Sequence, residues 1–345
     1  MASNEFKDVE LNILIFGWNE GFKKIYEENF KRISSEFPKL HNYVIVNNIE
    51  EELQKIKDVK IDIICSSPFF AKNVQYVLKN FPSVKWLHSL SAGIEKYLKI
   101  DEISKNEKLI FSNSKGAYSE ALGENGITAM MYFSYNLYSY TEHMKNKEWI
   151  RPSNNSLFKK TLLIVGYGNN GVCLAKIAKS GFNMKVIGVN RTKRDDVPGK
   201  EYTDELYTMK DLPDKVINEA DYVYATLPSN PETDNIFDKN FFSKMNKNAV
   251  FVNVGRGNAV DEDAIADALE NNNIRGAVLD VTKNEPLNKD SRLYNISPSK
   301  LLITNHSLCI VPENSKNGFD CFINNLKSYI KTGQPINIVD RKRQY

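Results

Sequence analysis

The sequence predicts an α/β protein built on doubly wound parallel sheets. Short apolar runs alternate with stretches of helical periodicity from the first residues onward, which is the pattern of parallel α/β folds. One apolar run, Leu162 to Val165, leads into a G-x-G-x-x-G turn, and a helical stretch and a further apolar run follow it, as a βαβ unit requires. The 345 residues are enough for two domains of ordinary size.

The first part of the chain is expected to form one α/β unit of roughly 110 residues. Its apolar runs are short, and helical or polar stretches separate them. We predict strands over residues 11–16, 43–46, 61–65, 84–90 and 109–112, and helices over residues 21–37, 49–56 and 71–80. A long helix over residues 117–145 follows, and we expect it to bridge this unit and the next.

The second part of the chain is expected to form a larger sheet that begins at the glycine turn. A polar surface loop over residues 151–160 leads into its first strand. Further strands are predicted over residues 184–189, 221–227, 249–255, 274–280 and 301–304, and helices over residues 172–180, 261–271 and 314–332. Asp261 is the expected N-cap of its helix, and the last helix ends at Gly333. Residues 336–339 are expected to return to the first unit as a short strand.

Composition restricts the partners of this protein. The net charge is only +3, with acids and bases interspersed, so no nucleic-acid or membrane partner is expected. The four cysteines show no C-x-x-C spacing, and no apolar run approaches the length of a membrane span or a signal-peptide core. A reducing, cytoplasmic location fits best. No cluster of His, Asp and Glu has metal-ligand spacing, so no metal site is expected.

The glycine turn predicts a site for the pyrophosphate of a dinucleotide. Gly166 permits the tight turn, Gly168 lets a phosphate approach the backbone, and Gly171 lets the helix pack close to the strand. Asn169 and Asn170 begin the helix, whose amides and dipole favour an anion. The motif alone is weak, because glycine turns also precede ordinary helices, but the flanking strands and helix favour the nucleotide-binding interpretation.

The end of the second strand of this βαβ unit indicates which dinucleotide is bound. An acid is expected there when the adenosine ribose has a free 2'-hydroxyl, but the residue 19 positions after Gly171 is Asn190. A run of donors and positive charge that suits a 2'-phosphate follows it: Arg191, Thr192, Lys193 and Arg194. We therefore predict NADP(H) as the preferred cofactor, with NAD(H) as the alternative. The other interpretation of this run is a solvated basic loop.

Three later strand ends carry residue types that suit hydride transfer to a 2-oxo acid. Arg256 follows one strand, Glu285 lies five residues past Asp280 at the end of the next, and His306 ends the last. These ends should meet at one edge of the sheet. A guanidinium can hold a carboxylate and a carbonyl, and a histidine can protonate the carbonyl oxygen. A carboxylate beside the histidine raises its pKa. Asp280 is expected near the nicotinamide ring.

Each of these residues also has an ordinary structural interpretation. His306 could be a core histidine, Arg256 a surface turn cation, and Glu285 a charge before a proline. Their joint occurrence favours the catalytic interpretation. Only His306 lies at a late strand end. The other three histidines, His41, His88 and His143, lie in early, polar or helical surroundings.

The order of these motifs resembles the D-isomer-specific 2-hydroxy acid dehydrogenase family. The matching segments cover most of residues 120–313: Trp149, residues 162–171, 227–233, 251–261 and 279–287, and Asn305-His306 with Glu313 seven residues on. The resemblance implies that Arg256, Glu285 and His306 form the catalytic triad. It adds four residues to the cofactor site: Leu227, Pro228, Val254 and Gly255. A less specific segment, Ser91-Ala92-Gly93, is similar to the family's substrate-carboxylate loop, in which the backbone amides of Ala92 and Gly93 meet the acid.

The resemblance also implies the domain organisation and the assembly. Two Rossmann-like domains are expected, with the active site in the cleft between them. A discontinuous, flavodoxin-like substrate domain would comprise residues 1–116 and 310–345, and a dinucleotide-binding domain would comprise residues 117–309. Family members are usually dimers through the nucleotide-binding domain, so a homodimer is expected. The tail after Val339 is similar to that of the glyoxylate/hydroxypyruvate reductase A subgroup, many of which use NADPH.

The predicted function is NADPH-dependent reduction of a small 2-oxo acid, such as glyoxylate or hydroxypyruvate, to the D-2-hydroxy acid, with His306 as the proton donor. Two alternatives stay open: an NAD-dependent phosphoglycerate dehydrogenase-like enzyme, and a nicotinamide-sensing binding protein similar to the C-terminal-binding-protein corepressors. The chain departs from the family at Ser307-Leu308-Cys309, where Ile-Ala-Gly or Ile-Ala-Ala is usual, and at Ser91, where Gly is common. These departures leave the substrate side chain open.

Overall fold

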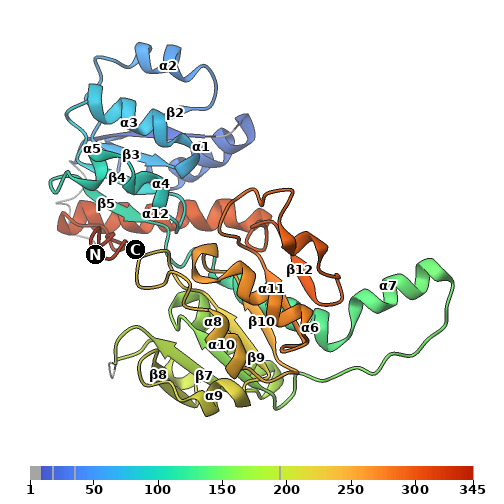
Figure 1. Cartoon of the computed structure of the whole chain (residues 1–345). Coiled ribbons are helices and arrows are strands. Elements are labelled where there is room, and N and C mark those ends of the chain that lie inside the picture. The colour runs from blue at the N-terminus through green and yellow to red at the C-terminus, as the bar shows by residue number, and fades with distance from the viewer. Residues whose placement is uncertain (1–8, 18, 35, 194–195, 345) are drawn as a thin grey trace. The chain divides into compact units, whose positions relative to one another are not determined.

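A computed structural model describes residues 9–17, 19–34, 36–193 and 196–344 (Figure 1). The chain divides into two compact units. The first unit comprises Met1–Ala117 and Pro312–Tyr345, and the second comprises Tyr118–Val311. Each unit is built around its own parallel sheet, so the α/β fold class is confirmed.

The first unit holds a five-stranded sheet in the order β2-β1-β3-β4-β5, and every neighbouring pair is parallel. Its strands are β1 Leu11–Phe16, β2 Leu40–Ile45, β3 Ile63–Ser66, β4 Trp86–Ser89 and β5 Ile110–Asn113. Its helices are α1 Glu20–Ser34, α2 Ile49–Lys55, α3 Ala71–Asn80, α4 Glu95–Leu98, α5 Asp101–Ser104 and α12 Pro312–Thr332.

Side chains on β1 alternate between two apolar layers, as the period of a strand requires. Ile13 and Ile15 pack with α1 and α12 on one face of the sheet. Leu14 and Phe16 pack with α2, α3 and α5 on the other. The C-terminal helix α12 is therefore part of the core of the first unit, although it is distant from the other elements in sequence.

The second unit holds a seven-stranded sheet in the order β12-β11-β10-β9-β6-β7-β8, and all its pairs are parallel. Its strands are β6 Thr161–Val165, β7 Lys185–Asn190, β8 Glu205–Thr208, β9 Tyr222–Ala225, β10 Val250–Asn253, β11 Gly276–Leu279 and β12 Leu301–Ile303. Its helices are α6 Ser119–Ser134, α7 Leu137–Asn146, α8 Asn169–Phe182, α9 Asp214–Glu219, α10 Lys239–Lys244 and α11 Glu262–Glu270.

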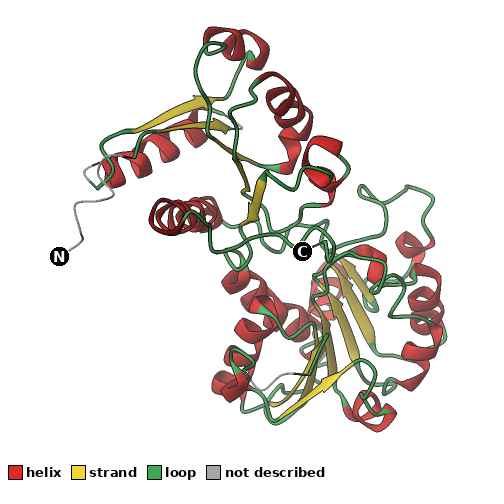
Figure 2. Cartoon of the chain, turned by 90° about the vertical axis from the view of Figure 1, so that its left-hand side faces the viewer, coloured by secondary structure: helices red, strands yellow, loops and turns green. Residues whose placement is uncertain are grey.

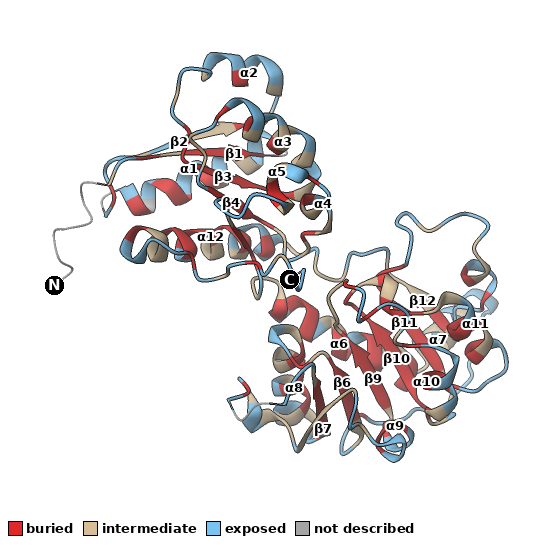
Figure 3. Ribbon diagram, turned by 60° about the vertical axis from the view of Figure 1, so that its left-hand side comes forward, coloured by how far each residue is buried: buried red, intermediate tan, exposed pale blue. Residues whose placement is uncertain are grey.

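Helices cover both faces of this second sheet (Figure 2). Leu162 and Ile164 of β6 pack with α6 and α8, while Leu163 and Val165 pack with α9, α10 and α11. The central strands are buried on both faces (Figure 3). Because all strands are parallel, their carboxyl ends lie at one edge of the sheet, where ligands bind in open α/β sheets.

Most of the predicted elements are confirmed, with shifted ends. The bounds predicted for β1 and α3 agree with the structure, and Asp261 caps α11 by accepting hydrogen bonds from the amides of Asp263 and Ala264, both at 3.1 Å. Among the described residues, no helix is both long and apolar enough to cross a bilayer.

Other predictions about elements are wrong or incomplete. The single helix over residues 117–145 is interrupted between α6 and α7 by Asn136, which has a left-handed φ of 47°. Tertiary contacts hold this break, since the Asn136 side chain donates to Ser153 O at 2.7 Å and accepts from Arg275. The short edge strand β8 was not predicted, because it lacks a continuous apolar run, and the short helices α4, α5, α9 and α10 were not predicted either. Residues 336–339 form only an isolated bridge between Ile338 and Ser112 instead of a strand.

Candidate active site

The glycine turn after β6 forms a backbone cradle that fits a pyrophosphate. Gly166 has a φ of +104°, and a Cβ there would lie 2.7 Å from Thr226 O. A Cβ on Gly171 would lie 2.7 Å from Gly166 O, so helix α8 can approach the turn only with glycine at this position. A Cβ on Gly168 would meet no atom within 4 Å, so this part of the turn is open to a ligand.

The side chain of Asn170 ties the turn to its neighbours. Its Nδ2 donates to Thr226 Oγ1 at 3.1 Å, and its Oδ1 accepts from Ser119 Oγ at 2.7 Å. These bonds join the first turn of α8 to the end of β9 and the start of α6. The contribution expected of Asn169 and Asn170 to a bound phosphate therefore rests on backbone amides at the N-terminus of α8.

The end of β7 carries the residues predicted to select the cofactor. Asn190 is the last residue of the strand, and the three residues that follow it are exposed. Arg191 Nη2 lies 2.8 Å from Glu232 Oε1, in the segment that follows β9. Glu232 was not predicted as a site residue, although it lies in the same segment as Leu227 and Pro228. Arg194 lies outside the described residues.

Arg256 lies on a rigid turn after β10. The buried Asn253 accepts from the Gly255 amide at 3.0 Å and donates to Arg256 O at 3.1 Å. A Cβ on Gly255 would lie 2.5 Å from Leu227 N, and one on Gly257 would lie 1.9 Å from the carbonyl carbon of Thr282. The turn is thus held against the segments after both neighbouring strands, β9 and β11, which leaves its backbone little freedom.

The structure brings Glu285 and His306 into contact. Glu285 Oε2 lies 2.8 Å from His306 Nδ1, and the two side chains are 40% and 43% exposed, so solvent and small molecules can reach them. Glu285 also accepts a hydrogen bond from the Thr282 amide at 3.3 Å. The Glu285–Pro286 peptide bond is cis.

The pKa values of this pair move apart. The hydrogen bond that His306 donates to Glu285 and the negative charge of Glu285 raise the pKa of His306, and they outweigh partial burial and the charge of Arg256, which lower it. Burial by itself would raise the pKa of Glu285. The hydrogen bond from His306 and the charge of His306 outweigh burial and lower this pKa below its ordinary value, with a smaller contribution from Arg256. The charge of Arg256 thus acts on the pKa values of both partners, while its Nη1 donates to Gly255 O at 2.7 Å.

The backbone that carries His306 is held by Asp280. Asn305 and His306 have left-handed φ values of 53° and 55°, a conformation that is unfavourable for most residues other than glycine. The His306 amide donates to Asp280 O. The Asp280 carboxylate is buried, and its Oδ1 accepts from Thr304 Oγ1 at 2.7 Å, Ser307 N at 2.9 Å and Leu308 N at 3.1 Å. The role visible for Asp280 is thus to fix the strained loop.

In the first unit, the Ser91–Gly93 loop is held by its carbonyl groups. Ser89 Oγ donates to Ser91 O at 3.0 Å, and Asn113 Nδ2 donates to Ala92 O at 2.8 Å. Within the described part of the chain, the amides of Ala92 and Gly93 donate to no protein acceptor. The loop thus presents two amides, as a carboxylate-binding loop requires.

A buried polar network lies beneath this loop and was not predicted. His88 contacts Ser112 Oγ through Nδ1 at 2.8 Å and Ser114 Oγ through Nε2 at 3.1 Å, and complete burial lowers its pKa to about 3. The Asn113 amide donates to Asn337 O at 3.1 Å. The C-terminal tail therefore supports the loop through Asn113. Sequence periodicity gives no sign of such a network, because its members lie far apart along the chain.

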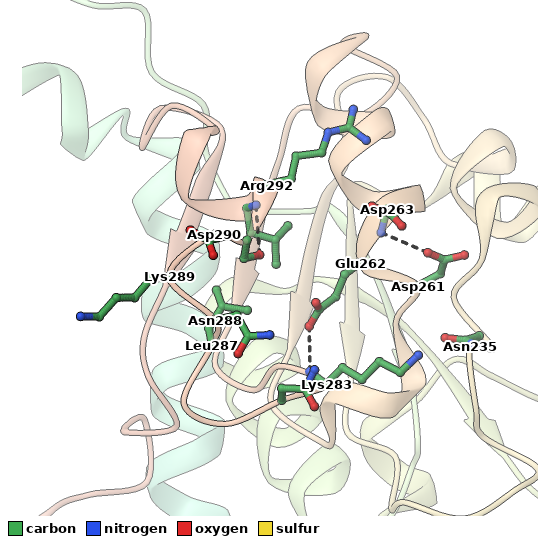
Figure 4. Close-up of a pocket in the computed structure, with 13 residues that line it drawn as sticks. Asn235, Asp261, Glu262, Asp263, Lys283, Leu287, Asn288, Lys289, Asp290 and Arg292 are labelled. Carbon is green, nitrogen blue, oxygen red and sulfur yellow. Dashed lines mark hydrogen bonds between the residues drawn. The ribbon is translucent and has the colours of Figure 1, made fainter.

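A separate polar cavity of about 560 Å³ lies beside the N-terminus of α11 (Figure 4). It contains none of the predicted site residues. Glu262 Oε1 accepts from the Lys283 amide at 2.7 Å on its wall, and this bond fixes the segment that leads to Glu285. Among the described residues, no group of three His, Cys, Asp or Glu side chains is arranged to hold a metal ion.

Relatives of this chain were found by sequence. A curated probable 2-ketogluconate reductase from Dictyostelium discoideum is 29% identical over 328 residues, which cover 92% of this chain and 94% of that protein. Glyoxylate/hydroxypyruvate reductase B from Salmonella paratyphi A is 29% identical over 255 residues, covering 72% and 76% of the two chains. This relative carries the B designation, whereas the C-terminal tail indicated the A subgroup.

Solved structures agree in fold. A D-isomer specific 2-hydroxyacid dehydrogenase family protein from Aeromonas salmonicida superposes with a TM-score of 0.80 at 26% identity, covering 96% of this chain and 100% of that one. An NADPH-dependent glyoxylate/hydroxypyruvate reductase from Sinorhizobium meliloti superposes with a TM-score of 0.75, covering 98% and 100%, but at 22% identity it supports the fold alone.

The family itself is established by a match over the second unit. The model of the D-isomer specific 2-hydroxyacid dehydrogenase NAD-binding domain matches residues 127–307, which include the glycine turn, Arg256, Glu285 and His306. This match spans more than half of the 345 residues. The chain therefore belongs to the D-isomer specific 2-hydroxyacid dehydrogenase family and is an NAD(P)-dependent oxidoreductase.

Proposed function

We propose that this protein reduces a small 2-oxo acid to the D-2-hydroxy acid with NADPH. The observation that carries the proposal is the 2.8 Å contact between Glu285 and His306, on segments that follow strands of the same sheet as the glycine turn. The names of the curated relatives support glyoxylate, hydroxypyruvate and 2-ketogluconate as candidate substrates.

The chemistry divides between the cofactor and three side chains. When bound, the nicotinamide supplies a hydride to the carbonyl carbon of the substrate. His306 donates a proton to the carbonyl oxygen from Nε2, because Glu285 engages its Nδ1. Glu285 fixes the orientation of the ring and stabilises the imidazolium. Arg256 holds the substrate carboxylate and carbonyl through its paired N–H groups.

The proposed cofactor site combines the cradle after β6 with the ends of three further strands. The N-terminus of α8 holds the pyrophosphate, and Leu227, Pro228, Val254 and Gly255 line the path of the dinucleotide. NADP(H) is preferred because β7 ends in Asn190 instead of an acid, and Arg191, Thr192 and Lys193 bring donors to the 2'-phosphate. Asp280 supports the nicotinamide end by holding the His306 loop.

The proposed roles of the two units follow from these sites. The second unit is the dinucleotide-binding domain. The first unit is the substrate domain, in which the amides of Ala92 and Gly93 bind the substrate carboxylate beside Ser91. We place the reaction in the cytoplasm, because all four cysteines are free thiols, which suits a reducing compartment.

A spectrophotometric panel tests the proposed function. Glyoxylate, hydroxypyruvate, 2-ketogluconate and pyruvate are each assayed with NADPH and with NADH, and 3-phosphoglycerate is assayed with NAD⁺. Faster turnover of a 2-oxo acid with NADPH is expected. A preference for NADH would contradict the cofactor assignment, and efficient phosphoglycerate oxidation would favour the dehydrogenase alternative. Negligible turnover, together with partner binding that depends on nicotinamide redox state, would favour the corepressor-like alternative.

The pH dependence of reduction follows from the His306–Glu285 pair. Reduction needs protonated His306, whose pKa is raised by Glu285, so activity is retained below that raised pKa and is lost as pH rises through it. Glu285→Gln removes the negative partner and should lower the pKa of His306. The alkaline limb of the kcat/KM profile for the 2-oxo acid should therefore move to lower pH. An unshifted limb in the variant would show that Glu285 does not set the protonation of the catalytic group.

Asn113 should affect substrate binding through the Ser91–Gly93 loop. Asn113→Ala removes the 2.8 Å bond to Ala92 O, which loosens the loop. We expect KM for the 2-oxo acid to rise by about tenfold, as for the loss of one hydrogen bond, with a smaller change in kcat and an unchanged Kd for NADPH. Asn29→Ala is the matched control, because Asn29 is a buried asparagine of the same unit that donates to Ile25 O at 2.9 Å on α1. Equal KM values for wild type and N113A would argue against the assigned loop.

We also propose that the protein is a homodimer formed through the second unit. Helix α7 projects away from the sheet of its own unit (Figure 1). It and the segment after it expose apolar side chains: Leu137, Tyr140, Met144, Trp149 and Ile150. Such a surface is typical of a protein interface. Light scattering should show a dimer for the wild type and a monomer for the double variant Met144→Glu/Trp149→Glu. A monomeric wild type would contradict the proposal.

A further inference from the structure

The ion pair between Arg191 and Glu232 lies at the adenosine end of the proposed cofactor site. Arg191 directly follows β7, and Glu232 lies in the segment after β9. In the sheet, β6 lies between these two strands. The pair therefore joins the segments on either side of the strand that ends in the glycine turn, with 2.8 Å between Nη2 and Oε1.

Glu232 is held in place by its own segment. Its amide donates to Asn230 Oδ1 at 2.9 Å, and Thr233 Oγ1 donates to Pro228 O at 2.8 Å. Asn230 and Thr233 are both buried. The backbone of Glu232 is therefore fixed by a buried turn, while its carboxylate extends into solvent to reach the guanidinium.

A 2'-phosphate would compete with the Glu232 carboxylate for the guanidinium of Arg191, whose Nη2 already donates to Glu232 Oε1. A guanidinium offers its donors in a fixed planar fork, and a carboxylate and a phosphate bind that fork in similar ways. A phosphate that approaches Arg191 must displace the Glu232 carboxylate or share the guanidinium with it, and the two anions repel each other. A dinucleotide without the 2'-phosphate leaves the ion pair intact.

We propose that Glu232 is a specificity-determining residue that competes with the 2'-phosphate for Arg191 and so narrows the preference for NADP(H) over NAD(H). This inference rests on the cofactor assignment in the proposed function. The phosphate still prevails, because it carries roughly 1.5 to 2 negative charges at neutral pH against one for the carboxylate. The competition is modest, since both side chains are exposed to solvent, which screens their attraction.

The test measures binding of 2',5'-ADP and 5'-ADP by titration calorimetry, so it does not depend on turnover. Glu232→Gln should increase the affinity for 2',5'-ADP by about two- to fivefold and leave the affinity for 5'-ADP unchanged, as expected for one exposed ion pair. Asp234→Asn is the matched control. It removes the same charge from the same segment, but Asp234 accepts a hydrogen bond from Asn258. Asp234→Asn should change neither affinity.

A double-mutant cycle decides whether Arg191 mediates the effect. In an Arg191→Ala background, Glu232→Gln should no longer change the affinity for 2',5'-ADP. Weaker binding of 2',5'-ADP by E232Q would overturn the inference, because it would show that Glu232 positions the guanidinium for the phosphate. Equal changes for both nucleotides, no change, or an effect that persists without Arg191 would overturn it as well. A wild type that binds 2',5'-ADP no more tightly than 5'-ADP would instead refute the cofactor assignment, independently of the E232Q comparison.

Discussion

Replacing His306 with glutamine is expected to lower kcat for 2-oxo acid reduction by roughly a hundred- to ten-thousandfold, the usual contribution of a general acid. Glutamine has a similar reach and can donate a hydrogen bond, but it cannot deliver a proton at neutral pH. The contact of His306 with Glu285 would change, while the glycine turn and the end of β7 would not. The Kd for NADPH should therefore stay near the wild-type value, and stopped-flow or steady-state reduction assays give kcat.

His41→Gln is the control for this variant. His41 lies on the exposed edge strand β2 of the first unit, where its Nε2 is 3.9 Å from Glu10. Its replacement should leave kcat unchanged. Wild-type turnover by H306Q would remove His306 from the proposed mechanism, because another group would then have to protonate the substrate oxygen.

Arg256→Lys is expected to reduce kcat/KM for the 2-oxo acid by about a hundredfold, because lysine keeps the charge but cannot hold a carboxylate and a carbonyl with paired N–H groups. The turn that carries Arg256 is fixed by Asn253 and by the close approach of Gly255 and Gly257 to neighbouring segments. A lysine at this position therefore cannot regain the geometry by a shift of the backbone. KM and kcat are measured over a range of substrate concentrations at saturating NADPH.

Arg275→Lys provides the comparison for a structural arginine. Arg275 directly precedes β11, at the amino ends of the strands and away from the carboxyl ends that carry Arg256, and it donates to Ser299 O at 3.2 Å and to Asn136. We expect this variant to lower thermal stability without changing kcat/KM. If R256K and R275K have the same kinetic effect, Arg256 is a structural residue and does not bind the substrate.

The prediction for His306 depends on a loop that is strained in the folded protein. Two consecutive left-handed residues, Asn305 and His306, would relax without support. Asp280 supplies that support with one side-chain oxygen that accepts three hydrogen bonds and a backbone carbonyl that binds the His306 amide. The imidazole is thus placed by a buried carboxylate that holds the backbone of its loop.

The sequence was sufficient for those features that depend on short-range patterns. A short apolar run predicted β1, which packs on both faces, and helical periodicity predicted α3. The position of Asp261 predicted the cap of α11. The glycine spacing predicted the turn after β6, because Gly166 and Gly171 are required by close contacts with the segment after the adjacent strand and with the turn itself.

Features that depend on partners distant in sequence required the tertiary structure. The break at Asn136 is held by Ser153 and Arg275, and Glu232 reaches Arg191 across 41 residues. Likewise, Asn113 supports Ala92 only because the sheet places β5 beside β4.

The sequence by itself determined the α/β class, the glycine turn and the set of residue types for hydride transfer, since periodicity and local turn chemistry encode them. Only the tertiary structure decided that Glu285 and His306 meet at 2.8 Å, that Asp280 holds the histidine loop and that Glu232 contacts Arg191. The physical reason is that a hydrogen bond between side chains depends on distances of a few tenths of an ångström, and these are set by the packing of whole strands and helices.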